Sequence, residues 1–116
     1  MSAQDVFLIL GIGLVIFFVV RTVLAARNRI SGAEAKAKVE AGALLLDVRS
    51  AAEFRGGAIP GAKNIPVQVL AGRIGELDRS RPLVVYCASG MRSASAVSLL
   101  KRQGFEAYDL GPAAAW

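Results

Sequence analysis

The sequence lacks histidine entirely and contains a single cysteine, Cys87, among its 116 residues. Without histidine, the Cys–His pairs of thiol proteases and hydrolases are excluded, and so are zinc sites of the usual cysteine and histidine kind. One cysteine also excludes an internal disulfide, which fits a reducing compartment. We therefore expect no metal, no resident cofactor, and one thiol as the candidate nucleophile.

Aromatic residues are few, at 7% of the chain, and the net charge of +5 comes from basic residues scattered mostly one at a time. Surfaces that bind nucleic acids gather their basic residues into patches and often add aromatic side chains for base stacking. We therefore expect a solvated basic surface here and no nucleic-acid partner.

Charge is absent from the longest apolar run, Val6 to Val20, and Arg21 follows it. If Arg21 reaches toward the lipid headgroups, residues 6–26 span about 31 Å, enough for one bilayer crossing. A cleaved signal peptide would begin with basic residues, but only Asp5 stands before this run. A core helix of a soluble domain would have an amphipathic face, which the run lacks. We predict a tail over 1–4 and a transmembrane helix over 5–26.

Basic residues flank this segment on one side only. None precedes it, and five follow it closely: Arg21, Arg27, Arg29, Lys36 and Lys38. The positive-inside tendency predicts a single-pass membrane protein with its C-terminal domain in the cytoplasm. The reduced state expected for Cys87 agrees with that location.

Strand-like and helix-like segments alternate after a linker over 27–31. Helices are expected over 32–41, 51–54, 67–77 and 94–100, and extended segments over 43–48, 63–66, 82–87 and 105–110. Ser31 is the expected N-cap of the first helix, with Glu34 completing a capping box, while Gly72 and Gly75 weaken the third helix. This alternation predicts one α/β domain over 32–116, with a parallel sheet covered by helices.

Two polar side chains stand at the ends of predicted strands, Asp47 at the end of the first and Cys87 at the end of the third. Ligands of such sheets bind outside the carboxyl ends of the strands, so we expect both residues to face one crevice. Gly90 permits a tight turn with positive φ. The N–H groups of residues 88–93 and the following helix would then surround the sulfur and favour a thiolate or a bound anion.

From Ile30 to Trp116 the sequence resembles the rhodanese family of sulfurtransferases. The motifs that carry the resemblance are Leu46-Asp47-Val48-Arg49 with Glu53-Phe54, Gly57-Ala58-Ile59-Pro60-Gly61-Ala62-Lys63-Asn64-Ile65-Pro66, Val85-Tyr86-Cys87-Ala88-Ser89-Gly90-Met91-Arg92-Ser93, and Gly111 with Ala115-Trp116. The chain departs from the family pattern at Gly57, where a histidine is frequent, and at Pro112, where a glycine is usual. We expect both departures to alter a turn and a terminus and to leave the chemistry intact.

The resemblance implies a rhodanese-type sulfurtransferase of the thiosulfate:cyanide class. Cys87 would take a sulfane sulfur from thiosulfate or a persulfide, hold it as a persulfide, and pass it to a thiol, to cyanide or to a protein acceptor. The substrate-binding loop would be Ala88, Ser89, Gly90, Met91, Arg92 and Ser93. Arg92 would either contact the substrate or brace the loop through a carboxylate. We interpret Asp47, Arg49 and Glu53 as a supporting charge network rather than as catalysts.

Two other functions remain open at this point. Dual-specificity phosphatases of the cell-cycle type share the architecture but place five residues between cysteine and arginine. Only four residues separate Cys87 from Arg92, so the loop is one residue too short to surround a phosphate. The second alternative is a membrane-tethered sulfur carrier or docking module with little turnover. Ala88 favours it, because typical thiosulfate-using relatives carry an additional basic residue in this loop.

Overall fold

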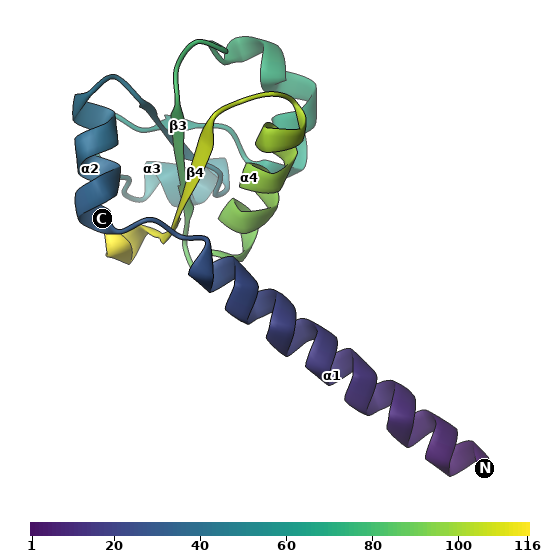
Figure 1. Cartoon of the computed structure of the whole chain (residues 1–116). Coiled ribbons are helices and arrows are strands. Elements are labelled where there is room, and N and C mark those ends of the chain that lie inside the picture. The colour runs from purple at the N-terminus through teal and green to yellow at the C-terminus, as the bar shows by residue number, and fades with distance from the viewer.

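The computed structural model describes residues 1–116, apart from the side chain of residue 25. A long helix leads into a small α/β domain (Figure 1). The elements are α1 (Ala3–Arg27), α2 (Gly32–Glu40), β1 (Leu44–Asp47), α3 (Ala51–Arg55), β2 (Lys63–Asn64), the 3-10 helix η1 (Val67–Glu76), β3 (Leu83–Cys87), α4 (Met91–Arg102), β4 (Ala107–Pro112) and the 3-10 helix η2 (Ala113–Ala115).

The four strands form one sheet in the order β2-β1-β3-β4, and all three pairings are parallel. The chain passes from β1 to β2 on one side and then returns to place β3 on the other side of β1. This reversal makes the carboxyl ends of β1 and β3 the point where an open α/β sheet usually binds its ligand. Asp47 and Cys87 are the last residues of these two strands. The predicted α/β fold with a parallel sheet flanked by helices is confirmed.

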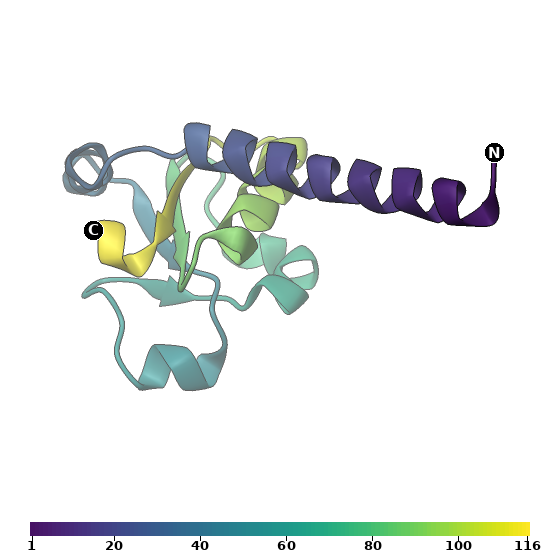
Figure 2. The same ribbon diagram turned by 90° about the horizontal axis from the view of Figure 1, so that it is seen from below.

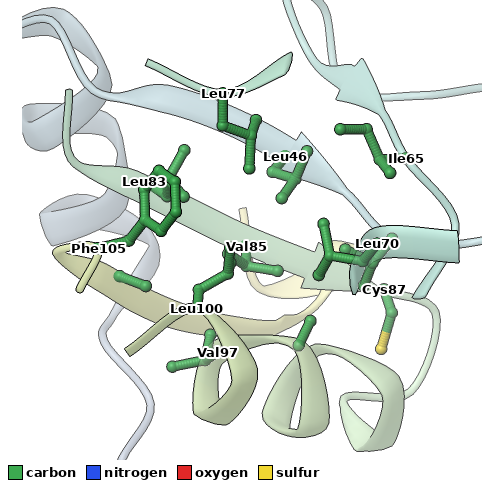
Figure 3. Packing of buried hydrophobic residues seen from close by; sticks show 13 residues of the cluster. Leu46, Ile65, Leu70, Leu77, Leu83, Val85, Cys87, Val97, Leu100 and Phe105 are labelled. Carbon is green, nitrogen blue, oxygen red and sulfur yellow. The ribbon is translucent and has the colours of Figure 1, made fainter. Parts of the chain in front are cut away.

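Two apolar layers cover the sheet, one on each face. On one face, α4 and η1 pack onto β1 and β3 through residues such as Leu46, Leu70, Val85 and Leu100, and Cys87 lies at the edge of this layer (Figure 3). On the opposite face, α2 and η2 cover the second layer, which contains Ala35, Leu45, Val84, Tyr86 and Leu110. All five residues of β3 are buried, as expected for a central parallel strand covered on both faces.

Helix α1 extends away from the domain in both views (Figures 1 and 2). Its segment Ala3–Leu24 is long and apolar enough to cross a membrane, and none of its most apolar stretch is buried within the molecule. Its apolar side chains therefore do not contribute to the core of the α/β domain. This helix includes the predicted membrane segment 5–26 and is the chain's candidate for membrane crossing.

Some local predictions differ from the structure. The helix expected over 67–77 is the 3-10 helix η1, because Gly72 and Gly75 each disfavour an α-helix by about 1 kcal/mol relative to alanine. Ser31 does cap α2 by accepting the N–H of Glu34, but the complete capping box is found one helix later, between Ser50 and Glu53.

The last strand begins and ends two residues later than predicted. Strand β4 continues through Gly111, whose φ of +83° is accompanied by a register shift opposite Val85 and Tyr86. The shift places an extra residue in β4 and brings Gly111 beside Tyr86 at the carboxyl edge of the sheet.

Candidate active site

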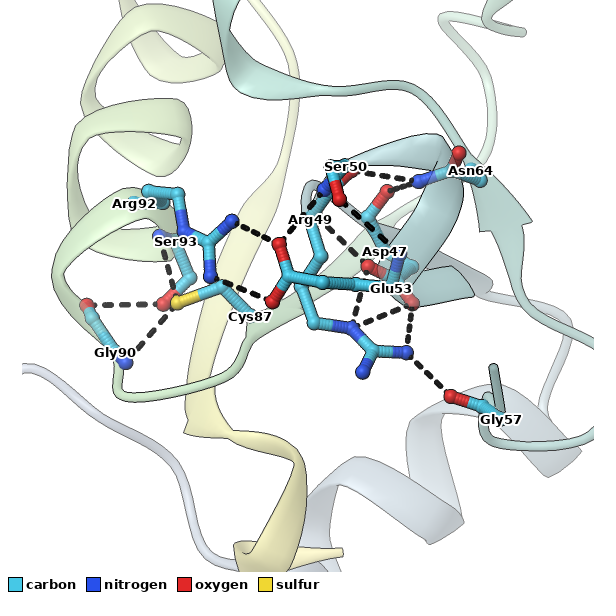
Figure 4. A network of polar contacts seen from close by, with 10 residues as sticks. All are labelled: Asp47, Arg49, Ser50, Glu53, Gly57, Asn64, Cys87, Gly90, Arg92 and Ser93. Atoms are coloured by element: carbon cyan, nitrogen blue, oxygen red, sulfur yellow. Dashed lines mark hydrogen bonds and ion pairs between the residues drawn. The ribbon is translucent and has the colours of Figure 1, made fainter. Parts of the chain in front are cut away.

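Cys87 lies at the junction of β3 and α4, and its sulfur accepts two hydrogen bonds from the main chain. The N–H of Gly90 donates to Sγ at 3.0 Å and the N–H of Ser93 donates at 3.3 Å (Figure 4). The sequence led us to expect the N–H groups of residues 88–93 around the sulfur, and these two are the ones in contact among the described residues. The remaining loop side chains Ala88, Ser89 and Met91 are exposed at the rim, while Cys87 itself is buried.

Gly90 gives the loop its shape. Its φ is +101°, a conformation that residues with a Cβ rarely adopt, and it immediately precedes the first residue of α4. This turn directs its N–H back toward Cys87. The Ser93 hydroxyl donates to the Gly90 carbonyl at 3.0 Å and closes the loop from the helix side. The sulfur therefore lies inside a small concave surface of N–H groups at a helix N-terminus, which favours an anion.

Arg92 is held by Glu53, 39 positions away in the sequence. Two hydrogen bonds join the guanidinium to the carboxylate, at 2.7 and 3.1 Å. Glu53 also completes the capping box of α3, where its carboxylate accepts the Ser50 N–H at 3.1 Å. Arg92, together with the Ser50 N–H, lowers the pKa of Glu53 to about 2. Of the two roles considered for Arg92, the structure thus shows the contact with a carboxylate that braces the loop against α3.

Asp47 and Arg49 form a second pair at the end of β1. The Arg49 Nη2 lies 2.7 Å from Asp47 Oδ2, and the Arg49 N–H donates to Oδ1 at 2.8 Å. Arg49 also donates to the Gly57 carbonyl at 2.8 Å, so the pair ties the turn after α3 to the sheet. The contact with Asp47 raises the pKa of Arg49 above its usual value.

Asp47 and Cys87 share an edge of the sheet but not a face. Asp47 lies opposite Tyr86 in the β1–β3 register, and Tyr86 belongs to the layer covered by α2. Cys87 follows Tyr86 and so points to the opposite face, toward α4. The single crevice expected from the sequence is therefore divided: the thiol contacts its own loop, whereas Asp47 contacts Arg49.

Sequence reasoning missed two residues at this edge. The Asn64 side chain donates to the carbonyls of Asp47 and Arg49, at 3.0 and 2.9 Å, and fixes the turn after β1. The Arg29 side chain, from the linker after α1, lies against Gly90 and Gly111. Its place in a run of basic residues indicated only membrane orientation, and no sequence pattern links it to the cysteine loop.

A metal centre is not indicated at this site. Among the described residues, no group of three or more cysteine, aspartate or glutamate side chains could hold a metal ion. The donors that surround Sγ are main-chain N–H groups, which bind anions and not cations.

Comparison with known proteins gives a consistent result. Residues 31–111 match the rhodanese-like domain family. A sulfurtransferase from Allochromatium vinosum is 40% identical over 62 residues, which cover 53% of this chain and 58% of that protein. The thiosulfate sulfurtransferase GlpE from Shewanella oneidensis is 42% identical over 74 residues, covering 62% of this chain and 73% of that protein. The chain thus spans little more than half the length of the Allochromatium protein.

Solved structures show the same likeness. The human single-domain sulfurtransferase TSTD1 superposes with a TM-score of 0.63 at 30% identity, over 77% of this chain and 91% of that one. A full-length protein from Lactobacillus plantarum superposes with a TM-score of 0.68 at 32% identity, over 86% of this chain and 88% of that one. With its parallel sheet and its cysteine loop between β3 and α4, the chain belongs to the rhodanese-like domain family and is related to rhodanese-type sulfurtransferases.

Proposed function

We propose that this chain transfers a sulfane sulfur from a donor to a thiophilic acceptor through a persulfide on Cys87. The main observation is that Sγ accepts two main-chain N–H bonds, one from Gly90, within the four residues that separate Cys87 from Arg92, and one from Ser93, directly after Arg92. Such donors are fixed by the backbone and stabilise an anionic sulfur at no cost of reorganisation. The donor is thiosulfate or a persulfide, and the acceptor is a thiol, cyanide or a protein.

The first half-reaction loads the cysteine. The thiol proton leaves to solvent, and the Cys87 thiolate attacks the outer sulfur of thiosulfate. A new S–S bond forms at Sγ while the S–S bond of thiosulfate breaks, and sulfite departs with the electron pair. A persulfide anion stays on Cys87, so charge and electrons balance without an external oxidant or reductant.

The second half-reaction returns the free enzyme. Cyanide or a thiolate attacks the outer sulfur of the persulfide, the S–S bond to Sγ breaks, and the Cys87 thiolate leaves with the electron pair. Neither half-reaction needs a proton shuttle, which is compatible with a chain that lacks histidine. The N–H groups of Gly90 and Ser93 stabilise the sulfur anion in both directions.

Arg92 and Glu53 are positioning residues in this proposal. Their paired hydrogen bonds connect the first turn of α4 to α3 and hold the loop in the shape that directs Gly90 and Ser93 at the sulfur. Asp47 and Arg49 support the neighbouring turn and do not touch the reacting atoms.

The alternative function is that of a sulfur carrier or docking module. The exposed loop residues Ala88 and Ser89 bear no charge to recognise thiosulfate. In that case a protein partner loads or unloads Cys87, and turnover with small molecules is slow.

Steady-state thiocyanate formation from thiosulfate and cyanide distinguishes these functions. We expect activity in the full chain and none in Cys87→Ser, and unchanged activity in the variant would contradict the proposal. Stoichiometric loading without turnover, followed by transfer to a protein thiol, would favour the carrier. Hydrolysis of an aryl phosphate by the wild type but not by Cys87→Ser would favour the phosphatase.

We also propose that α1 crosses the membrane once and leaves the domain in the cytoplasm. The proposal is supported by the apolar exposed surface of α1 and by the basic residues that follow it. A Ser98→Cys variant in a Cys87→Ser background places one thiol at an exposed position of α4. A reagent that cannot cross membranes should label it only after the cells are opened, whereas labelling of intact cells would reverse the orientation.

A further inference from the structure

The linker after α1 brings a basic side chain to the active-site loop. Arg29 precedes Ile30, whose N–H donates to the Asp109 carbonyl at 2.8 Å, and Arg29 itself forms a parallel bridge with Asp109. These main-chain contacts fix the linker along β4. They place the Arg29 side chain beside Gly90 and Gly111 and thus beside the carboxyl end of the sheet.

Both glycines leave room that the Arg29 side chain occupies. A Cβ added to Gly90 would overlap the guanidinium, and one added to Gly111 would come within 2.7 Å of Arg29 Cδ and Nε. Both glycines also have positive φ, +101° and +83°. The guanidinium therefore packs directly on the backbone of Gly90, the residue whose N–H donates to Cys87 Sγ at 3.0 Å.

Burial raises the pKa of the Asp109 carboxylate and the charge of Arg29 opposes this rise, but no hydrogen bond among the described residues uses the side-chain donor groups of Arg29. Nε is buried without a hydrogen-bond partner. Across residues 1–116 as described, the other guanidinium nitrogens likewise make no hydrogen bond and no ion pair, in contrast to Arg49 and Arg92. A guanidinium that served only to brace the loop would donate to its carbonyls. A buried donor without a partner is costly, and it is compatible with a site that an anion completes.

We infer that Arg29 binds the anionic end of the sulfur donor at the mouth of the Cys87 loop, an inference that rests on the proposed sulfur transfer. The ligand is a small anionic sulfane compound, such as thiosulfate, whose sulfonate oxygens accept from the guanidinium while its outer sulfur meets Sγ. Arg29 thereby supplies the cationic group that Ala88 does not provide. Because Arg29 follows α1 by only two residues, the donor site is complete only when the linker is docked on β4.

Alkylation of Cys87 tests this inference without relying on turnover. Iodoacetate and iodoacetamide share the leaving group and differ in charge, and Cys87 is the only thiol in the chain. The full chain is compared as wild type, Arg29→Gln, Arg29→Lys and the matched control Arg27→Gln, which removes a charge at the exposed end of α1. Loss of one charge-assisted hydrogen bond should lower the ratio of iodoacetate to iodoacetamide rates about tenfold in Arg29→Gln. We expect Arg29→Lys to restore part of the ratio and Arg27→Gln to leave it unchanged.

An unchanged ratio in Arg29→Gln, or equal slowing with both reagents, would overturn the inference, because a purely structural residue would not distinguish the two charges. Persulfide loading supplies the second readout. The thiosulfate concentration for half-maximal loading should rise about tenfold in Arg29→Gln, with the maximal loading rate retained. If the wild type accepts no sulfur at all, the proposed transfer fails, and the alkylation ratio still decides whether Arg29 binds anions.

Discussion

Two arginine–carboxylate pairs lie at the carboxyl edge of the sheet, and burial distinguishes them. In the Asp47–Arg49 pair the side chains are 0% and 13% exposed, whereas in the Glu53–Arg92 pair they are 37% and 31% exposed. The buried pair locks the end of β1 to the turn at Gly57, and the exposed pair connects α3 to the cysteine loop. A buried charge left alone is costly, while an exposed one is hydrated. The first pair should therefore control folding and the second the position of the loop.

The largest expected effect comes from breaking the buried pair. Asp47→Ala leaves the mostly buried Arg49 guanidinium without its carboxylate, and we expect a loss of about 3–5 kcal/mol in the free energy of unfolding. Urea denaturation measures it. The matched control is Glu76→Gln, which removes the carboxylate from the exposed Arg73 pair on η1, and its unfolding midpoint should hardly move. Equal unfolding midpoints for the two variants would show that burial does not make the Asp47–Arg49 pair more important for stability than the exposed Glu76–Arg73 pair.

Gly90→Ala tests the cysteine loop, which the exposed Glu53–Arg92 pair holds in position. Alanine is strained at φ +101° and should cost about 1–2 kcal/mol of stability. Its Cβ also meets Arg29, so persulfide loading should fall sharply. Gly42→Ala shares the positive φ, +113°, but has open space around it. We expect Gly42→Ala to show only the cost of the positive φ, with normal loading. Equal loss of loading in both variants would refute the importance of space at Gly90.

Glu53→Gln should separate loop geometry from stability. Arg92 loses its charged partner, and we expect loading of Cys87 to slow about tenfold because the loop N–H groups move away from the sulfur. The thermal midpoint at neutral pH should fall only slightly, because solvent screens the exposed pair and reduces the stability that the low pKa of Glu53 can contribute. A variant that unfolds easily but loads at the normal rate would assign Glu53 to the fold and not to the loop.

Acid titration provides a further check on Glu53. Its pKa of about 2 in the folded chain lies below the usual 4.5, so its contribution to stability is complete above that usual value. The contribution is lost as the pH falls from about 4.5 toward 2. Unfolding measured across this range should have a shallower pH dependence in Glu53→Gln than in the wild type.

The smallest effect is expected at Tyr86, beneath the buried pair. The Arg49 guanidinium lies 5.6 Å from the Tyr86 ring centre, and the Tyr86 hydroxyl accepts the Ile59 N–H at 3.2 Å. Burial raises the pKa of Tyr86 from 10.0 to about 12. The folded chain therefore loses stability as the pH rises from about 10 through 12. Tyr86→Phe should flatten this alkaline decline in urea denaturation, and an unchanged slope would contradict it.

The sequence alone was sufficient to predict where most helices and strands lie and which thiol is the candidate nucleophile. Apolar runs of strand length and a lone cysteine before a glycine locate β3, Cys87 and the start of α4 within a few residues, because these features depend on local spacing. The helix predicted over 67–77 is a 3-10 helix in the structure. Its glycines reduce the preference for an α-helix, so the packing of Leu70 into the core has more influence on its conformation.

Side-chain pairing at the site could not be derived in the same way. Glu53 contacts Arg92 across 39 positions of the sequence. Arg29 contacts Gly90 from the linker that precedes the domain. Such contacts depend on how the strands align, and no spacing rule encodes them. The alternation of strand side chains also determines that Asp47 and Cys87 face opposite sides, which became clear only from the register of Asp47 with Tyr86.

The central claim is that Cys87 carries the sulfur. Intact-mass measurement after a single exposure of the full chain to thiosulfate, with excess donor removed, tests it most directly. We predict a gain of one sulfur atom per chain, located on the peptide that contains Cys87, lost on addition of cyanide and absent in Cys87→Ser. A chain whose mass does not change, or a Cys87→Ser variant that gains the same mass, would contradict the account.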